Sequence, residues 1–237
     1  MRITIVVPTL NEQECIAQTV RSLQQLEGEK EIIVVDGGSS DETRSLARAE
    51  GAKILTAPAG RGLQMHAGAL QASGEVLWFL HADTIPPPDA LKEISQHLQD
   101  ASIAGGNFGL LFDGPSRAAR RMTAIYPMLR ILGLCYGDSG IFMRREIYHK
   151  IGGFRALALF EDLDLLRRLR RGGRFIHLPS QICASSRRFE QRNFAVVWLH
   201  WTTLQVLYWA GVPPNWLARW YRHARRTTPS TVTLRGR

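Results

Sequence analysis

The hydrophobic positions in the first half of the chain form short continuous runs, separated by helical patterns. The runs ITIVVP (3–8), EIIVVD (31–36), AKILTA (52–57) and EVLWFLHAD (75–83) are apolar at nearly every position. Such runs are typical of parallel strands buried on both faces, and residues 63–72 predict a helix before the fourth run. The pattern predicts an α/β fold with a mostly parallel sheet flanked by helices.

Two capping signals predict where the first helices begin. TLNE at residues 9–12 and SSDE at residues 39–42 have the Ser/Thr-x-x-Glu form of a capping box. Ile16, Val20 and Leu23 then share one face of the first helix. We therefore expect each helix to open at its box, directly after a strand.

Polar residues gather where the predicted strands end. They are Glu12 after the first strand, Asp36 at the end of the second, and His81 and Asp83 after the fourth, with Pro8 and Gly37 beside them. In open α/β sheets, ligands bind beyond the carboxyl ends of the strands. The first strand is not followed by G-x-G-x-x-G, so NAD or FAD binding is not expected. These strand ends predict a site for a different ligand.

Asp36 and the glycines after it suit a nucleoside. An aspartate at a strand end can hydrogen-bond a ribose or a base edge, and GGSSD at residues 37–41 lets backbone approach a ligand closely. The same residues also fit a tight turn in which Ser39 caps the next helix. The pattern leaves both interpretations open.

His81 and Asp83 suit a divalent cation. A Mg²⁺ or Mn²⁺ ion that holds substrate phosphates usually needs only one or two protein carboxylates. Asp83 supplies one, and His81 suits Mn²⁺ better than Mg²⁺. The alternative is that Asp83 caps the loop TIPPPD (84–89), with His81 packed beneath it.

The segment FEDLDLLRRLRRGG predicts a helix that starts near Glu161. Asp162 shares the apolar face of this helix with Leu165, Leu166 and Leu169, so its carboxylate is expected to point inward. Such a carboxylate needs a partner or a function, whereas the helix dipole explains Glu161. Asp164 shares its face with Arg167, Arg168 and Arg171 and is expected in solvent, as a partner for i,i+3 and i,i+4 ion pairs.

Two further pairs of residues are candidates for the site. Arg187 and Arg188, in SSRRFEQR, suit a diphosphate through forked, charge-assisted hydrogen bonds, although a solvated basic turn is the alternative. Asp138 and Ser139, in YGDSGIFMRR, stand before a short strand and predict an acceptor-side loop.

Taken together, these motifs resemble those of family 2 glycosyltransferases with the GT-A fold, over roughly residues 1–190. The motifs that carry the resemblance are IVVPTLNE, EIIVVDGGSSDET, RGLQMHAGA, FLHADT, GGFR and FEDLDLLRRLRRGG. Two more stretches, GDSGIFMRREIYHKIGGF and SSRRFEQRN, followed by a segment ending in GVPPNWLARWY, are most similar to the bacterial subfamily of arsenosugar-biosynthesis glycosyltransferases.

The resemblance implies inverting transfer of a sugar from a nucleotide diphosphate sugar, expected to be a UDP-sugar, to an acceptor hydroxyl or carboxylate. It places Pro8, Glu12, Asp36 and Gly37 near the nucleoside, Arg61 near the base or ribose, and Arg187 and Arg188 near the diphosphate. It places Asp83 on the cation, Glu161, Asp138 and Ser139 on the acceptor side, and Asp162 as the base. The family usually has Asp-x-Asp where this chain has His81-Ala82-Asp83, which leaves one carboxylate for Mn²⁺ or Mg²⁺.

Composition and charge add expectations about partners and location. The 237 residues carry a net charge of +9, which fits phosphorylated substrates or an anionic membrane. Nucleic-acid binding would also explain the charge, but no nucleic-acid motif is present. Three distant cysteines, and a start that reaches Pro8 too early for a secretory signal, predict a cytoplasmic location.

Residues 193–218 contain no Asp, Glu, Lys or Arg. Within them, FAVVWLHWTTLQVLYWAGV at residues 194–212 is long enough to be a transmembrane candidate. His200, Thr202, Thr203 and Gln205 lie near the middle and argue against a lipid-immersed span. The tryptophans and the arginines beyond them suit an interfacial helix on an anionic cytoplasmic leaflet. A core helix, one hidden in a homodimer, and a spanning helix are the alternatives.

The sequence thus predicts three parts: a glycosyltransferase domain over residues 1–190, an apolar helical segment over 191–221 and a basic, disordered tail over 222–237. The expected partners are a nucleotide-sugar donor and an acceptor that is either a small molecule or lipid-linked, with peripheral membrane contact. The competing hypothesis is a catalytically silent nucleotide-sugar-binding module at the membrane surface. His81 in place of an aspartate favours this alternative, and Asp162 opposes it.

Overall fold

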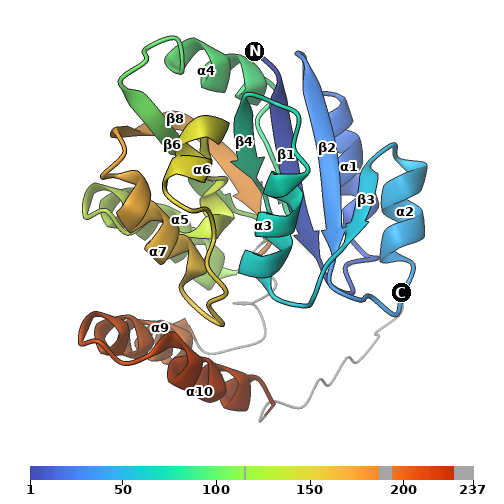
Figure 1. Cartoon of the computed structure of the whole chain (residues 1–237). Coiled ribbons are helices and arrows are strands. Elements are labelled where there is room, and N and C mark those ends of the chain that lie inside the picture. The colour runs from blue at the N-terminus through green and yellow to red at the C-terminus, as the bar shows by residue number, and fades with distance from the viewer. Residues whose placement is uncertain (115, 187–193, 227–237) are drawn as a thin grey trace.

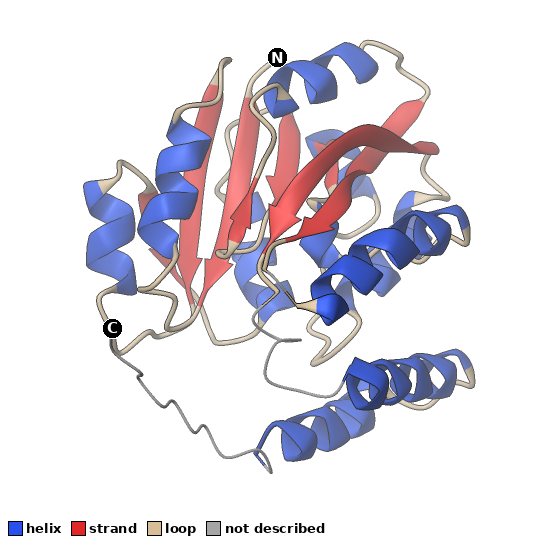
Figure 2. Cartoon of the chain, turned by 180° about the vertical axis from the view of Figure 1, so that it is seen from behind, coloured by secondary structure: helices blue, strands red, loops and turns tan. Residues whose placement is uncertain are grey.

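The computed structural model describes residues 1–114, 116–186 and 194–226, and it contains one mixed sheet with helices on both faces (Figures 1 and 2). The strands are hydrogen-bonded in the order β3-β2-β1-β4-β7-β6-β8-β5. They are β1 Ile3–Thr9, β2 Lys30–Asp36, β3 Lys53–Thr56, β4 Val76–Phe79, β5 Thr84–Ile85, β6 Ile103–Phe112, β7 Phe142–Arg144 and β8 Arg174–Ala184.

The helices lie between these strands and after the last of them. They are α1 Ile16–Gln24, α2 Thr43–Ala49, α3 Arg61–Leu70, α4 Ala90–His97, α5 Arg117–Ile131, α6 Arg145–Lys150, α7 Glu161–Leu169, α9 Phe194–Trp209 and α10 Pro214–Arg226, with a 3-10 turn η1 at Gly137–Ser139. The predicted helix over residues 63–72 is confirmed as α3.

The four predicted strands are confirmed, and they are parallel. β1 pairs with β2 on one side and β4 on the other, and β2 pairs with β3. Successive side chains alternate between two cores, with Ile5 and Val34 in one and Val6 and Ile33 in the other. Helices α1, α4 and α5 cover the first core and α3, α6 and α7 the second. This explains why β1, β2 and β4 are apolar at most positions, whereas β3 at the edge has exposed ends.

The sheet continues into the second half of the chain with a change of direction. β7 is antiparallel to both β4 and β6, β8 is parallel to β6, and β5 closes the edge antiparallel to β8. The short strand predicted after Asp138 and Ser139 is β7. The sheet therefore has a parallel half and a mixed half, and the seam between them lies at β4 and β7.

The two predicted capping boxes are wrong. α1 begins at Ile16 and α2 at Thr43, so both helices start after the boxes, without a side-chain cap. The residues of the boxes instead tie the two loops together: Ser39 Oγ accepts a hydrogen bond from Asn11 N at 2.9 Å, and Thr43 Oγ1 accepts one from Glu12 N at 2.8 Å. Hydroxyl groups that bind a neighbouring loop are not available as caps.

The apolar segment near the end forms two helices, α9 and α10, which lie beneath the carboxyl ends of the parallel strands (Figure 1). α9 packs Trp198 and Trp201 against the main core, and its Leu204 packs with Leu159 and with Leu217 of α10. No helix in the described part of the chain is long and apolar enough to cross a bilayer. α10 continues to Arg226, into the segment predicted as a tail, and residues 227–237 lie outside the described residues.

Candidate active site

Asp36, the last residue of β2, is completely buried at the carboxyl end of the sheet. Its Oδ2 accepts hydrogen bonds from the backbone amides of Gly38 and Ser39, both at 2.9 Å. Its Oδ1 is buried and has no hydrogen-bond partner among the described residues. Because a buried carboxylate oxygen without a donor is unfavourable, Oδ1 suits a donor group of a bound ligand.

Gln64 of α3 joins this strand end to the start of its helix. Its Nε2 donates to the carbonyl oxygens of Thr9 at 2.7 Å and Val35 at 2.8 Å, and its Oε1 accepts from Gly60 N at 3.2 Å. A Cβ on Gly37 would lie 3.1 Å from the Gln64 amide, so the glycine permits this close approach. The sequence analysis did not single out Gln64. The sequence signal that could have identified Gln64 is a polar side chain on the face of a helix that packs against the sheet.

Arg61 lies one helical turn before Gln64 and reaches the other side of the site. Its Nε is 3.2 Å from Oε1 of Glu161, which is only 5% exposed. Burial disfavours the charge of Arg61, but the carboxylates of Glu161, Asp138 and Asp162 outweigh it and raise the pKa of Arg61 above its ordinary value. Arg61 is therefore a permanent cation at this end of the site.

Asp162 is held by two backbone amides. Gly137 N donates to its Oδ2 at 2.7 Å and Leu163 N donates to its Oδ1 at 2.8 Å. Burial and the neighbouring Glu161 charge nevertheless raise the pKa of Asp162 to about 6. A carboxylate with this pKa can accept a proton near neutral pH, which is the property required of a general base.

Asp164 is not in solvent, contrary to the sequence prediction. It is 3% exposed and bonds to Arg168 through Nε at 3.0 Å and Nη2 at 2.7 Å. The predicted pairing with Arg167 is present at 3.6 Å, and Arg155 adds a contact from outside the helix. Arg168 also donates to the Ile151 carbonyl at 2.6 Å, so this face of α7 packs on the preceding loop.

His81 and Asp83 follow β4, in a loop fixed by two threonines. Thr19 Oγ1 donates to the Ala82 carbonyl and Thr84 Oγ1 to the His81 carbonyl, both at 2.6 Å. His81 is buried, and its Nδ1 lies 2.6 Å from Oδ1 of Asp138. The contact connects the end of β4 to η1, whose Gly137 binds Asp162.

The residues at this loop fit a cation that is shared with substrate. No group of three His, Cys, Asp or Glu residues that could hold a metal ion is found in the described ranges. A Mg²⁺ or Mn²⁺ ion bound to a diphosphate takes most of its ligands from phosphates and water and needs one or two protein ligands. Asp83 supplies a carboxylate, and His81 Nε2 keeps a lone pair when Nδ1–H donates to Asp138.

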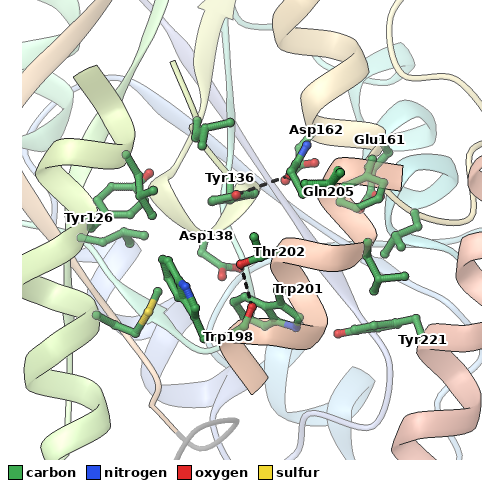
Figure 3. Close-up of a pocket in the computed structure, with 18 of the residues that line it drawn as sticks. Tyr126, Tyr136, Asp138, Glu161, Asp162, Trp198, Trp201, Thr202, Gln205 and Tyr221 are labelled. Atoms are coloured by element: carbon green, nitrogen blue, oxygen red, sulfur yellow. Dashed lines mark hydrogen bonds between the residues drawn. The ribbon is translucent and has the colours of Figure 1, made fainter. Parts of the chain in front are cut away.

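A cavity of about 250 Å³ joins the polar groups to apolar walls (Figure 3). Arg61, Asp138, Glu161 and Asp162 all line it, together with residues of β6, α5, α9 and α10. Ser139, which was predicted on the acceptor side, does not line it. Its Oγ is buried, accepts from Asn107 Nδ2 at 2.9 Å and donates to the Tyr136 carbonyl at 2.6 Å.

Most of the predicted site residues that the structure describes fall into two linked groups, whereas His81, Asp83 and Ser139 do not line the cavity. Pro8, Asp36 and Gly37 lie at the ends of β1 and β2, and Glu12 lies in the loop after β1. The second group lines the cavity, and α3 contacts both groups through Gln64 and Arg61. Arg187 and Arg188 lie outside the described residues. Tyr136 and Gln205 also line the cavity and were not among the predicted site residues.

The sheet order and the similarity to solved structures define the class, an α/β fold of the GT-A type. Comparison with known proteins makes the assignment specific. The Glycosyl transferase family 2 pattern matches residues 4–161, and the chain belongs to this family.

Individual relatives and structures agree with the assignment. The chain is 30% identical over 165 residues to the undecaprenyl-phosphate 4-deoxy-4-formamido-L-arabinose transferase of Sodalis glossinidius. The aligned region covers 63% of this chain and 50% of that protein. It therefore spans about half the length of this curated relative.

Two solved structures share the fold. One is S. aureus TarS 1-349 in complex with UDP, with a TM-score of 0.65 and 19% identity over 78% of this chain and 60% of that chain. The other is glucosyl-3-phosphoglycerate synthase from Mycobacterium tuberculosis in complex with Mn²⁺, UDP and phosphoglyceric acid, with a TM-score of 0.57 and 23% identity over 76% of this chain and 68% of that chain.

Proposed function

We propose that this chain transfers a sugar from a UDP-sugar, with inversion, to the hydroxyl or carboxylate of an acceptor. The observation that carries the proposal is Asp162, a carboxylate with a pKa of about 6 that lines a cavity beside the cation Arg61. The same observation favours an active enzyme over a silent binding module, because a binding module does not need a base.

The donor side rests on the ends of β1, β2 and β4. Asp36 Oδ1 suits an N–H or O–H donor of the nucleoside, and Pro8 and Gly37 are proposed beside it. UDP as the nucleotide is supported by the related structures that bind it. Arg187 and Arg188 are proposed as ligands of the diphosphate.

The chemical step follows from the charges around the cavity. The acceptor O–H gives its proton to Asp162, its oxygen forms a bond to the anomeric carbon, and the bond from that carbon to the diphosphate oxygen breaks on the opposite face. The bonding electrons leave with the nucleoside diphosphate. A Mg²⁺ or Mn²⁺ ion, when bound by Asp83 and His81, would stabilise that leaving charge. A carboxylate acceptor would need no proton transfer.

Four finer assignments belong to the same proposal. The arsenosugar-biosynthesis subfamily is proposed from the motifs quoted above. Peripheral contact with an anionic cytoplasmic membrane is supported by exposed apolar residues of α9 and α10, including Leu199, Trp209, Trp216 and Trp220. We also propose that the protein is cytoplasmic and forms a homodimer.

The test is Asp162→Asn, with sugar release from UDP-glucose, UDP-galactose and UDP-N-acetylglucosamine as the activity and UDP titration calorimetry with Mn²⁺ as the binding readout. We expect the variant to lose about 100-fold or more in transfer or donor hydrolysis and to bind UDP like the wild type.

Asp89→Asn is the matched control, because Asp89 is exposed at the start of α4 and its side chain makes no cap hydrogen bond there. Full activity in Asp162→Asn would remove Asp162 from the proposed role. Failure of the wild type to bind UDP, GDP or their sugars would overturn the transferase proposal itself.

A further inference from the structure

The side-chain amide of Gln205 is a buried polar group that the proposed transfer does not use. Gln205 lies on α9, is 6% exposed and lines the cavity. Its Oε1 accepts a hydrogen bond from the Tyr136 hydroxyl at 3.4 Å, and its Nε2 has no partner among the described residues. Rotating the amide by half a turn only exchanges which of its two atoms lacks a partner. A buried amide of this kind points to a ligand.

The position of Gln205 suggests which ligand group it contacts. Figure 3 shows Gln205, Tyr136 and Asp162 together at one end of the cavity. The reacting oxygen of an acceptor has to lie beside Asp162, so this end is where the acceptor's polar group belongs. An N–H of Gln205 there would donate to an oxygen of that group.

The rest of the cavity has apolar walls. They come from β6, α5 and α9 and include Leu110, Phe112, Met122, Leu129, Trp198 and Trp201. The sheet order places β4 and β7 between β1 and β6, so these walls stand away from the proposed nucleoside end at β1 and β2. The apolar space is thus on the acceptor side of Asp162.

The polar groups within these walls already have partners in the protein. Thr202 Oγ1 donates to the Trp198 carbonyl at 2.8 Å, and the Tyr126 hydroxyl accepts from Asn107 Nδ2 at 3.5 Å. A sugar-like acceptor would lose hydrogen bonds to water here without replacement, whereas an apolar body would not. Val206 and Trp209 line the cavity and are 53% and 62% exposed, so the apolar space reaches the surface along α9.

From these contacts we propose that the acceptor is an amphiphile. Its oxygen-bearing head accepts a hydrogen bond from Gln205 and presents the reacting oxygen to Asp162, and its apolar body lies against β6, α5 and α9. The proposal rests on the proposed function, since it assigns the acceptor of the same site. A membrane lipid with a small polar head and a water-soluble molecule with an apolar body share this chemistry.

The test measures the binding of decyl phosphate, kept below its micelle concentration, and of ethyl phosphate to the UDP-saturated full chain with Mn²⁺. Binding is detected by the change in tryptophan fluorescence, because Trp198 and Trp201 line the cavity. We expect decyl phosphate to bind at least about 100-fold more tightly than ethyl phosphate. Gln205→Leu, which keeps the size of the side chain, should weaken decyl phosphate binding by about three- to tenfold. Gln96→Leu on the exposed face of α4 is the matched control and should change nothing.

Equal affinities for the two phosphates would overturn the proposal that the acceptor has an apolar body. Unchanged binding in Gln205→Leu would overturn the proposed contact with Gln205 and would mean that a water molecule is the partner of its amide. Hexadecyl phosphate in phosphatidylcholine vesicles separates the sources: capture of the vesicle-borne form alone assigns a lipid, and capture of monomeric decyl phosphate alone assigns a soluble amphiphile. If UDP binds and no alkyl phosphate does, this inference fails and the proposed function stands. If UDP does not bind, the proposed function fails.

Discussion

Glu161 and Asp162 are adjacent carboxylates with different environments. Glu161 is paired with Arg61, whereas Asp162 accepts two backbone N–H groups and has a pKa raised to about 6. Adjacent carboxylates with different partners can have different roles in one site. Here Glu161 pairs with Arg61, and Asp162 is the group proposed to take up a proton.

The pH dependence of transfer follows from this division. Asp162 acts in its deprotonated form, which is populated above its pKa of about 6. For a hydroxyl acceptor we therefore expect kcat/KM to be level at higher pH and to fall about tenfold per pH unit below about 6. Glu161→Gln removes a negative neighbour that raises this pKa, so the fall should move to lower pH.

A pH–rate profile of both proteins, with UDP binding measured across the same range, checks this expectation. Asp89→Asn should keep the wild-type profile. A fall at the same pH in Glu161→Gln as in the wild type would show that another group sets it.

At the scale of elements, α3 holds the site together because it lies directly on the parallel strands. Gly68 makes this possible: a Cβ there would be 2.4 Å from Val6 Cγ1 and 3.0 Å from Val35 Cγ2. The close contact sets the height at which Gln64 meets the ends of β1 and β2. It also sets the height at which Arg61 meets Glu161.

Gly68→Ala should therefore destabilise the protein, although alanine favours a helix by about 1 kcal/mol. The added methyl has to displace β1 side chains, and we expect a net loss of about 1–3 kcal/mol in the free energy of unfolding, measured with urea. Val6→Ala in the same chain removes the clashing Cγ1, so the double variant should be more stable than the sum of the single effects predicts. Additive effects would mean that the clash is relieved elsewhere.

The elements divide into those that local sequence predicts and those that it does not. The strands β1, β2 and β4 are apolar at most positions because both faces of the sheet are covered, and this pattern is visible in the sequence. The helix starts were misplaced because Ser39 and Thr43 bind the loop after β1, a contact between segments far apart in the chain. β6 and β8 pair with each other across a long separation and were not predicted.

The site shows the same limit. Asp36, Arg61 and Asp162 stand in recognisable motifs. The burial of Asp164 depends on which loop covers α7, and the role of Gln205 depends on where α9 docks. A helical wheel gives the direction of a side chain, but it does not show what lies there.

At the scale of the whole molecule, the basic charge and the exposed aromatic residues of the last two helices both support the proposed membrane contact. The chain has a net charge of +9, and Trp209, Trp216 and Trp220 are each more than 60% exposed, at 62%, 68% and 62%. Cations are attracted to anionic lipid headgroups, and indole rings settle at the membrane interface. The positive charge and the exposed indole rings therefore both favour binding to an anionic membrane surface.

We expect the protein to bind vesicles of phosphatidylglycerol and phosphatidylcholine more tightly than vesicles of phosphatidylcholine alone, with binding weakened at high salt. Trp216→Ser with Trp220→Ser should weaken sedimentation with the anionic vesicles by about tenfold or more. Leu70→Ser, at an equally exposed apolar residue of α3, is the control and should have no effect. Equal binding to neutral vesicles, or an equal loss in the control, would contradict membrane attachment through α10.

The seam between β4 and β7 has a consequence for how the chain folds. It pairs residues 76–78 with residues 142–144, and beyond it Ile103 of β6 aligns with Arg174 of β8. Each pairing closes a loop of many residues, which is slower than the winding of any single helix. Arg61, Asp138, Asp162 and Gln205 stand on segments that meet only across these closures. We therefore expect these four residues to come together late in folding, after most of the elements that carry them have formed.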